Sequence, residues 1–152
     1  FFSGMRPAVN VGLSVSRVGG DAQTKAMKKA AGSIRIDLAQ YREMEVFTQF
    51  SSDLDEGTKE QLQYGKGLME LLKQPLCQPL SMAEQVITLY TATNKLFLDV
   101  DVKKIKAMQK DMLTYFKTEH PEIIQELNEK KVLSDELKER ILNAAKEFKS
   151  RC

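Results

Sequence analysis

The most constraining feature of this sequence is an apolar periodicity of three to four residues, which begins after residue 20 and continues to the end of the chain. The clearest example lies between residues 34 and 50, where the apolar positions are Ile34, Leu38, Tyr41, Met44, Phe47 and Phe50. This spacing puts the apolar side chains on one face of an α-helix, and that face must be buried against another element. Most of the chain is therefore expected to pack as helices around a shared core.

Helix start signals divide this region into about six helices. Residues 81–84 (S-M-A-E) form a capping box, in which the serine and glutamate side chains each bind the other residue's backbone N–H. Asp101 and Ser134 suit N-caps, Pro121 suits the first turn of a helix, and Asp21 is expected to cap the first helix. The predicted fold class is all-α, with a C-terminal bundle of about six helices after a short non-helical arm.

Three glycines fall inside these helical regions. Gly32 predicts a kink. Gly65 and Gly67 each cost about 1 kcal/mol relative to alanine in a helix interior, so they indicate either close packing or a locally weak helix.

The first twenty residues differ from the rest and contain no helical pattern. Pro7 and Gly12 interrupt a β-prone run, and two serines precede Arg17, which is expected to lie in a loop. A guanidinium held by a loop stays charged at any working pH and can bind two phosphate oxygens at once. A surface arginine in a turn is the alternative, and the S-x-S-R spacing alone does not distinguish the two.

Composition and missing motifs exclude several classes of function. The 152 residues carry 23 basic and 21 acidic side chains, so no broad basic surface for nucleic acid is expected, and the lysines of residues 103–110 are expected to form a solvated face.

Cys77 and Cys152 have no metal-ligand spacing and suit free thiols in a reducing compartment. His120 has no catalytic neighbours in sequence and is expected to be structural. There is no apolar run of about 18 residues and no G-x-x-x-x-G-K-[ST] motif.

Residues 73–79 (K-Q-P-L-C-Q-P) end one helix with a constrained loop that contains two prolines. This loop displays the side-chain amide of Gln74, and an amide can pair with the edge of an adenine. A simple connector between two helices is the other interpretation.

Residues 6–28 read R-P-A-V-N-V-G-L-S-V-S-R-V-G-G-D-A-Q-T-K-A-M-K, and this string closely resembles the alpha subunit of F-type ATP synthases. The resemblance continues through A-Q-Y-R-E-M-E-V-F-T-Q-F-S-S-D-L-D and E-L-L-K-Q and covers essentially the whole chain. The related beta subunit has P-L-D-S-T-S-R in place of V-G-L-S-V-S-R. The resemblance implies the C-terminal part of a longer, regulatory subunit, with residues 1–20 ending its nucleotide-binding domain and 21–152 forming its helical domain.

The same resemblance implies roles for individual residues. Arg17 is expected to act as an arginine finger in the catalytic site of a neighbouring beta subunit, and Ser14 belongs to the same loop. Residues that hold the adenine of a non-catalytic nucleotide carry over to Arg6, Pro7, Gln74 and Leu76. The family usually has a glutamine at the last of these positions, and Gln78 is a possible substitute.

The implied partners are beta, gamma and delta subunits in an alternating alpha–beta hexamer that couples proton or sodium flow to ATP synthesis. ATP or ADP with Mg is implied for the intact subunit and no cofactor for this chain alone, which is expected to be inactive. Membrane association is expected only through the complex, peripherally at the cytoplasmic face of a bacterial inner membrane, with the equivalent face in a mitochondrion or plastid as the alternative. Residues 51–57 are expected near the rotating central stalk. Two alternatives stay open. The chain could belong to a related hexameric motor, such as an export ATPase or a helicase, or it could be a helical interaction module.

Overall fold

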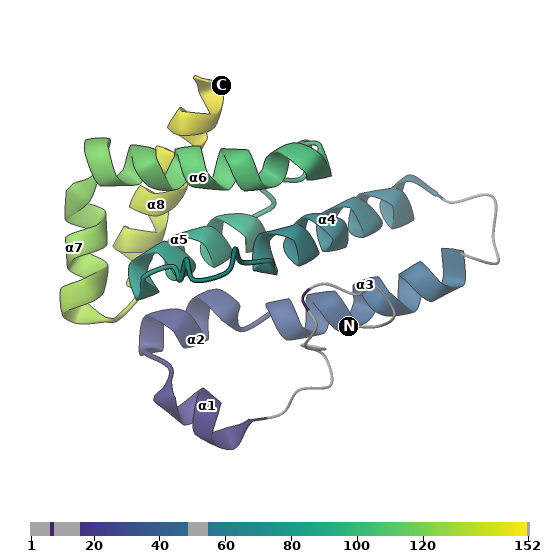
Figure 1. Cartoon of the computed structure of the whole chain (residues 1–152), viewed down its shortest axis with the longest axis horizontal. Helices are drawn as coiled ribbons and strands as arrows, with labels where there is room; N and C mark the ends of the chain where they lie inside the picture. The colour runs from purple at the N-terminus through teal and green to yellow at the C-terminus, as the bar shows by residue number, and fades with distance from the viewer. Residues whose placement is uncertain (1–6, 8–15, 49–54, 152) are drawn as a thin grey trace.

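The computed structural model describes residue 7 and residues 16–48 and 55–151, and within these ranges it contains eight helices and no strand (Figure 1). The predicted all-α fold is therefore confirmed. The helices are α1 (Arg17–Ala22), α2 (Lys25–Ala31), α3 (Ile34–Thr48), α4 (Glu56–Leu72), α5 (Met82–Thr93), α6 (Val102–Glu119), α7 (Pro121–Lys130) and α8 (Asp135–Ser150).

Helix α5 lies at the centre of the bundle and packs against α2, α4, α6, α7 and α8. Its side chains Ala83, Val86 and Ile87 are completely buried. Helices α6, α7 and α8 surround one end of α5, while α3 and the outer part of α4 extend to the other side (Figure 1). The core is thus a single cluster that links α2 at one end of the chain to α8 at the other.

The apolar stripe of α3 is buried as the periodicity predicts, because Ile34, Leu38 and Tyr41 face α4 and the core. The side chains of Phe47 and Phe50 lie outside the described residues. The predicted face of α8 is confirmed at each of its positions, which are Leu137, Ile141, Ala144, Ala145 and Phe148. A 3.6-residue repeat therefore identifies the core positions in both helices.

Close packing, rather than helix weakness, explains the glycines of α4. A Cβ atom built at Gly65 would lie 2.3 Å from ring atoms of Tyr41, and one at Gly67 would lie 3.3 Å from Cδ1 of Ile105. Glycine at these positions lets α3 and α6 approach the backbone of α4. At Gly32 the chain turns between α2 and α3, so the predicted kink is a complete break between two helices.

Most of the predicted caps are present. The capping box of α5 has both of its hydrogen bonds, from the Glu84 amide to Ser81 Oγ and from the Ser81 amide to the Glu84 carboxylate. Asp101 caps α6, Ser134 caps α8, and Pro121 begins α7. The break at His120–Pro121, which the sequence predicts, follows because proline lacks a backbone N–H and restricts the conformation of the residue before it.

The predicted cap at Asp21 is wrong, and so is the expectation that the arm stays non-helical to residue 20. Residues 17–22 form the short helix α1, whose N-cap Ser16 accepts a hydrogen bond of 2.9 Å from the Gly19 amide. Thr24, not Asp21, caps α2. Glycine disfavours helix, but the hydrogen bond that the Ser16 side chain accepts stabilises the first turn enough for Gly19 and Gly20 to be helical.

Candidate functional site

Arg17 is the first residue of α1 and is exposed to solvent. The cap at Ser16 fixes the backbone of this turn, because both its side chain and its carbonyl accept hydrogen bonds, from Gly19 and Gly20 respectively. Within the described part of the chain the Arg17 guanidinium pairs with no carboxylate. Its charge and its five donors are therefore not taken up by any carboxylate among the described residues.

Two of the predicted site residues, Arg6 and Ser14, lie outside the described residues. Pro7 is described and is half-buried. The expectation that Arg6 and Ser14 lie in the same site or loop as the other predicted residues therefore stays a prediction.

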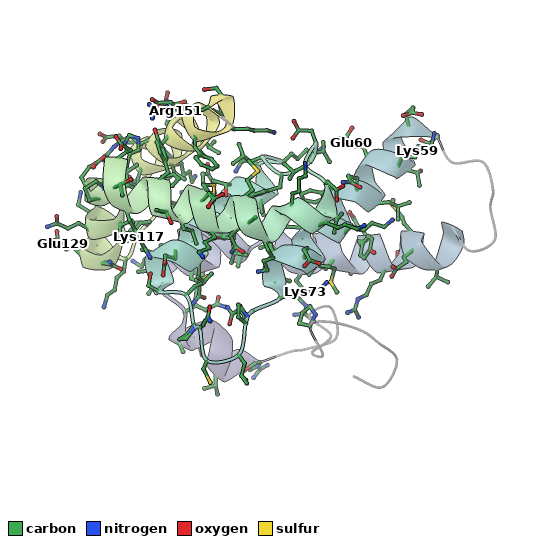
Figure 2. All side chains as sticks on the ribbon, turned by 45° about the horizontal axis from the view of Figure 1, so that its top comes forward. Lys59, Glu60, Lys73, Lys117, Glu129 and Arg151 are labelled. Atoms are coloured by element: carbon green, nitrogen blue, oxygen red, sulfur yellow. The ribbon has the colours of Figure 1, made fainter. Side chains whose placement is uncertain are left out.

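The second part of the candidate site is the loop between α4 and α5, at residues 73–81, which is fastened at both ends. At its start, Lys106 of α6 donates a hydrogen bond of 2.9 Å to the Leu71 carbonyl, and Lys73, which is labelled in Figure 2, pairs with Glu70. At its end, Gln85 donates a hydrogen bond of 2.8 Å to the Leu80 carbonyl, beside the capping box. The loop is thus held between two helix ends and α6.

A tight turn at residues 75–78 forms the tip of this loop. The Gln78 amide donates to the Pro75 carbonyl at 3.4 Å, and Cys77 takes a left-handed conformation with φ of 58°. A positive φ at the third residue of a turn is the type II arrangement, where glycine is usual. With cysteine it costs of order 1 kcal/mol, so the surrounding prolines and anchors hold this backbone in place.

The turn displays its polar and apolar groups to solvent. Gln74 and Gln78 are exposed, and Leu76 is 90% exposed. An exposed amide can donate to and accept from one edge of a purine base, whereas Leu76 offers only an apolar surface. No described hydrogen bond or ion pair joins this turn to Arg17, so the chain presents the two parts separately.

Sequence reasoning missed the role of Lys106, which it placed on a solvated lysine face. This side chain is half-buried, and burial lowers the pKa of its ammonium group. It donates to the Leu71 carbonyl and, at 2.9 Å, to Oε1 of Gln109. The signal in the sequence was its position next to Ile105, at the edge of the buried stripe of α6.

Glu84 links the end of the loop to α6. Its carboxylate binds the Ser81 amide at 2.7 Å and the Lys117 ammonium at 2.6 Å. Burial by itself would raise the pKa of Glu84, but the hydrogen bonds from Lys117 and Ser81 outweigh it and hold that pKa below its usual value. The carboxylate is therefore ionised at neutral pH and braces the loop against α6.

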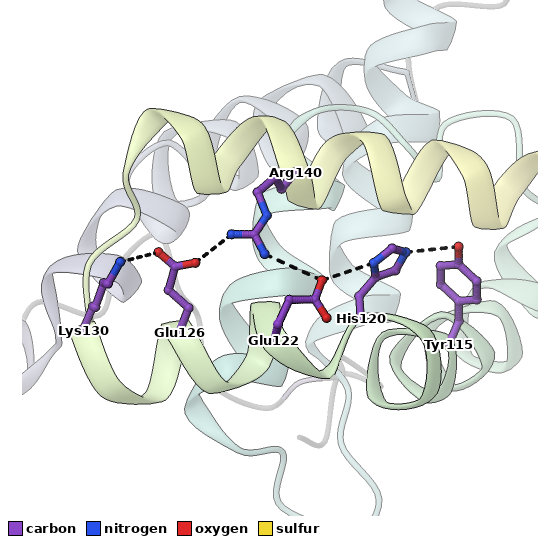
Figure 3. A network of polar contacts seen from close by, with 6 residues as sticks. All are labelled: Tyr115, His120, Glu122, Glu126, Lys130 and Arg140. Carbon is purple, nitrogen blue, oxygen red and sulfur yellow. Dashed lines mark hydrogen bonds and ion pairs between the residues drawn. The ribbon is translucent and has the colours of Figure 1, made fainter.

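His120 lies between the end of α6 and the start of α7 and belongs to the polar network drawn in Figure 3. Its Nε2 lies 3.3 Å from the Tyr115 hydroxyl and its Nδ1 lies 3.4 Å from Glu122. The network continues through Arg140, whose guanidinium binds Glu126 at 2.7 Å. These contacts tie α6, α7 and α8 together, as expected of a structural histidine.

A family model described as the ATP synthase alpha/beta chain, C terminal domain, matches residues 23–148. The chain belongs to this family. Among its similar relatives are proteins named ATP synthase subunit alpha from Clostridium kluyveri and Clostridium botulinum, each 51% identical over 149 residues. These alignments cover 98% of this chain, so the similarity includes the arm and the helical domain.

The same alignments cover 30% of each relative, so the chain spans less than a third of the length of the ATP synthase alpha subunits that it matches. In the described ranges no helix is both long and apolar enough to cross a membrane. Nor do the described histidine, cysteine and acidic side chains form a group of three or more that could hold a metal ion.

Proposed function

We propose that this chain is the region of an ATP synthase alpha subunit that supplies an arginine finger to the catalytic site of a neighbouring beta subunit. The observation that carries the proposal is the 51% identity to proteins named ATP synthase subunit alpha, which extends over 98% of the chain and so includes V-G-L-S-V-S-R. The exposed position of Arg17, with no carboxylate partner among the described residues, supports this role.

The chemistry of phosphoryl transfer explains why a single arginine matters. The protein mainly positions groups and neutralises the charge on the transferred phosphate, and an arginine from a neighbouring chain accelerates this step by about 10³ to 10⁵. In our proposal Arg17 provides that charge at the start of a capped helical turn, and Ser14 helps to hold the preceding loop.

The loop between α4 and α5 contributes to an adenine site in the same proposal. Gln74 offers its amide to the base together with Arg6 and Pro7 from the arm. Leu76 supplies an apolar contact where the family usually has glutamine, and Gln78 is placed on the same exposed turn to supply a second amide. The nucleotide is ATP or ADP with Mg in the intact subunit, whose phosphate-binding residues lie in a part of the protein that this chain does not include.

The proposed setting is a complex with beta, gamma and delta subunits that couples a proton or sodium gradient to ATP synthesis and lies peripherally at a membrane. The names of the matched relatives favour this setting over an export ATPase, a helicase or an isolated interaction module.

Replacing Arg17 by lysine in a reconstituted alpha–beta–gamma complex tests the proposal. Lysine keeps the charge but loses the planar fork, so steady-state ATP hydrolysis should fall by about 10³-fold while nucleotide occupancy of the beta subunit changes far less. Arg151→Lys is the matched control, since it makes the same chemical change at the far end of the chain and should leave turnover unchanged. Near-normal turnover with Arg17→Lys would remove this residue from catalysis, and equal losses of rate and occupancy would make it a binding residue.

A further inference from the structure

An open groove lies between the loop after α4 and helix α6, and the proposed function does not use its α6 side. Its volume is about 710 Å³. On the loop side it is lined by Gln74, Pro75, Gln78, Pro79 and Leu80, whereas Leu76 and Cys77 at the tip of the turn do not line it. Gln74 and Gln78, which the proposed function assigns to the adenine, therefore form one edge of the groove, and the lysines of α6 form the opposite side, to which that proposal gives no role.

Four lysines and two glutamates give the groove an excess of positive charge. The lysines are Lys73, Lys106, Lys110 and Lys117. Both glutamates are already paired within the chain, because Lys73 binds Glu70 and Lys117 binds Glu84. Figure 2 labels these two lysines. The two lysines between them, on α6, form no ion pair with any described carboxylate.

The hydrogen-bonding capacity of the Lys106 ammonium group is only partly used within the chain. An ammonium group has three N–H donors, and here two of them are used by neutral acceptors, the Leu71 carbonyl and Oε1 of Gln109. Gln109 is itself buried and donates to the Thr88 hydroxyl, so it is fixed in place. The third donor of a half-buried cation is left for an acceptor in the groove.

The spacing of the two unpaired lysines fits an extended peptide. Lys106 and Lys110 are four residues apart on one helix, which separates them by about 6 Å along its axis. In an extended chain, residues two apart point to the same side and are separated by about 6.5 Å. Between and beside the lysines the groove presents the apolar groups of Ala107, Leu113 and Leu80, and none of the described residues that line it is aromatic.

We propose that this groove binds an extended acidic segment of a partner chain, with carboxylates at positions i and i+2 that pair with Lys106 and Lys110 and an apolar side chain against Leu113. Charge complementarity and the apolar lining together favour this occupant. A single-stranded nucleic acid would also bring negative charge, but it binds best where aromatic side chains stack on its bases.

Fluorescence anisotropy with a labelled synthetic peptide, in which glutamates alternate with leucine and threonine, tests the proposal on this chain. The double variant Lys106→Gln/Lys110→Gln should bind the peptide about tenfold more weakly, the effect expected for two lost ion pairs. The double variant Lys103→Gln/Lys104→Gln is the matched control, because it removes the same charge from the same helix outside the groove and should change the affinity by less than about twofold.

Several outcomes would overturn the proposal. These are no saturable binding at millimolar peptide, equal losses in both double variants, or tighter binding of an oligouridylate that is lost in the same groove variant. Because the groove variant also removes the hydrogen bond from Lys106 to the Leu71 carbonyl, amide shifts of the unaltered chain give a second readout. They should move at Leu80, Ala107 and Leu113 on peptide addition, and shifts confined to other surfaces would contradict the assignment.

Discussion

At the scale of single residues, the contact between Gly65 and Tyr41 decides how closely α3 and α4 approach. The ring of Tyr41 occupies the space that any side chain at Gly65 would need. Its hydroxyl donates to Glu45 at 2.8 Å, so the ring is held from both ends. The sequence identified Tyr41 as a core position and Gly65 as a site of close packing or weakness, but it did not show that the two residues meet.

Gly65→Ala should destabilise the chain although alanine is the better helix former. Propensity favours alanine by about 1 kcal/mol, whereas a methyl group 2.3 Å from ring atoms forces a shift that typically costs about 1–3 kcal/mol. Urea denaturation followed by circular dichroism measures the change. Gly20→Ala in α1 is the control, because a Cβ there meets nothing within 4 Å, and it should leave the free energy of unfolding unchanged or raise it by up to about 1 kcal/mol. A more stable Gly65→Ala chain would show that α3 and α4 are not packed as described.

At the scale of elements, local signals predicted helix starts well and the anchoring of loops poorly. The capping box at Ser81, the aspartate at residue 101 and the proline at residue 121 each act within one turn, so the sequence reveals them. The bond from Lys106 to the Leu71 carbonyl joins residues 35 apart and depends on how α4 crosses α6. No pattern within either helix specifies that crossing.

The link between Glu84 of α5 and Lys117 of α6 should make stability depend on pH. Because the pKa of Glu84 is lower in the folded chain than in the unfolded chain, its ion pair contributes above the unfolded pKa and is lost as the pH falls through the folded pKa. Lys117→Met should therefore lower the free energy of unfolding by about 1 kcal/mol or less at neutral pH, and this difference should vanish in acid.

Urea unfolding across a pH series measures that difference. Lys110→Met is the control, since Lys110 lies on the same helix and pairs with no described carboxylate. It should show no such pH dependence. A Lys117→Met penalty that stays constant down to acidic pH would mean that the loss comes from packing and not from the ion pair.

At the scale of the whole molecule, the helical core is formed by residues of this chain, whereas the described residues of the candidate site lie mostly at the surface. The residues of the core come from α2 to α8 and are buried within this chain, which is why periodicity alone predicted so much of the fold. In contrast, Arg17 and the turn at residues 75–78 are exposed and are not joined to each other by a described polar contact. Their roles could be predicted only from the resemblance, because the groups that we propose they contact, a phosphate and an adenine, are not among the described residues.

The most direct test of the account is a chimera in which this chain replaces the matching region of the Clostridium kluyveri alpha subunit, reconstituted with the beta and gamma subunits of that enzyme. The measurement is steady-state ATP hydrolysis per assembled complex. If this chain supplies the arginine finger and completes the adenine site, the chimera should assemble and hydrolyse ATP within about threefold of the parental rate, a difference of less than 1 kcal/mol in the barrier. A complex that assembles with normal nucleotide occupancy but does not turn over would contradict the account.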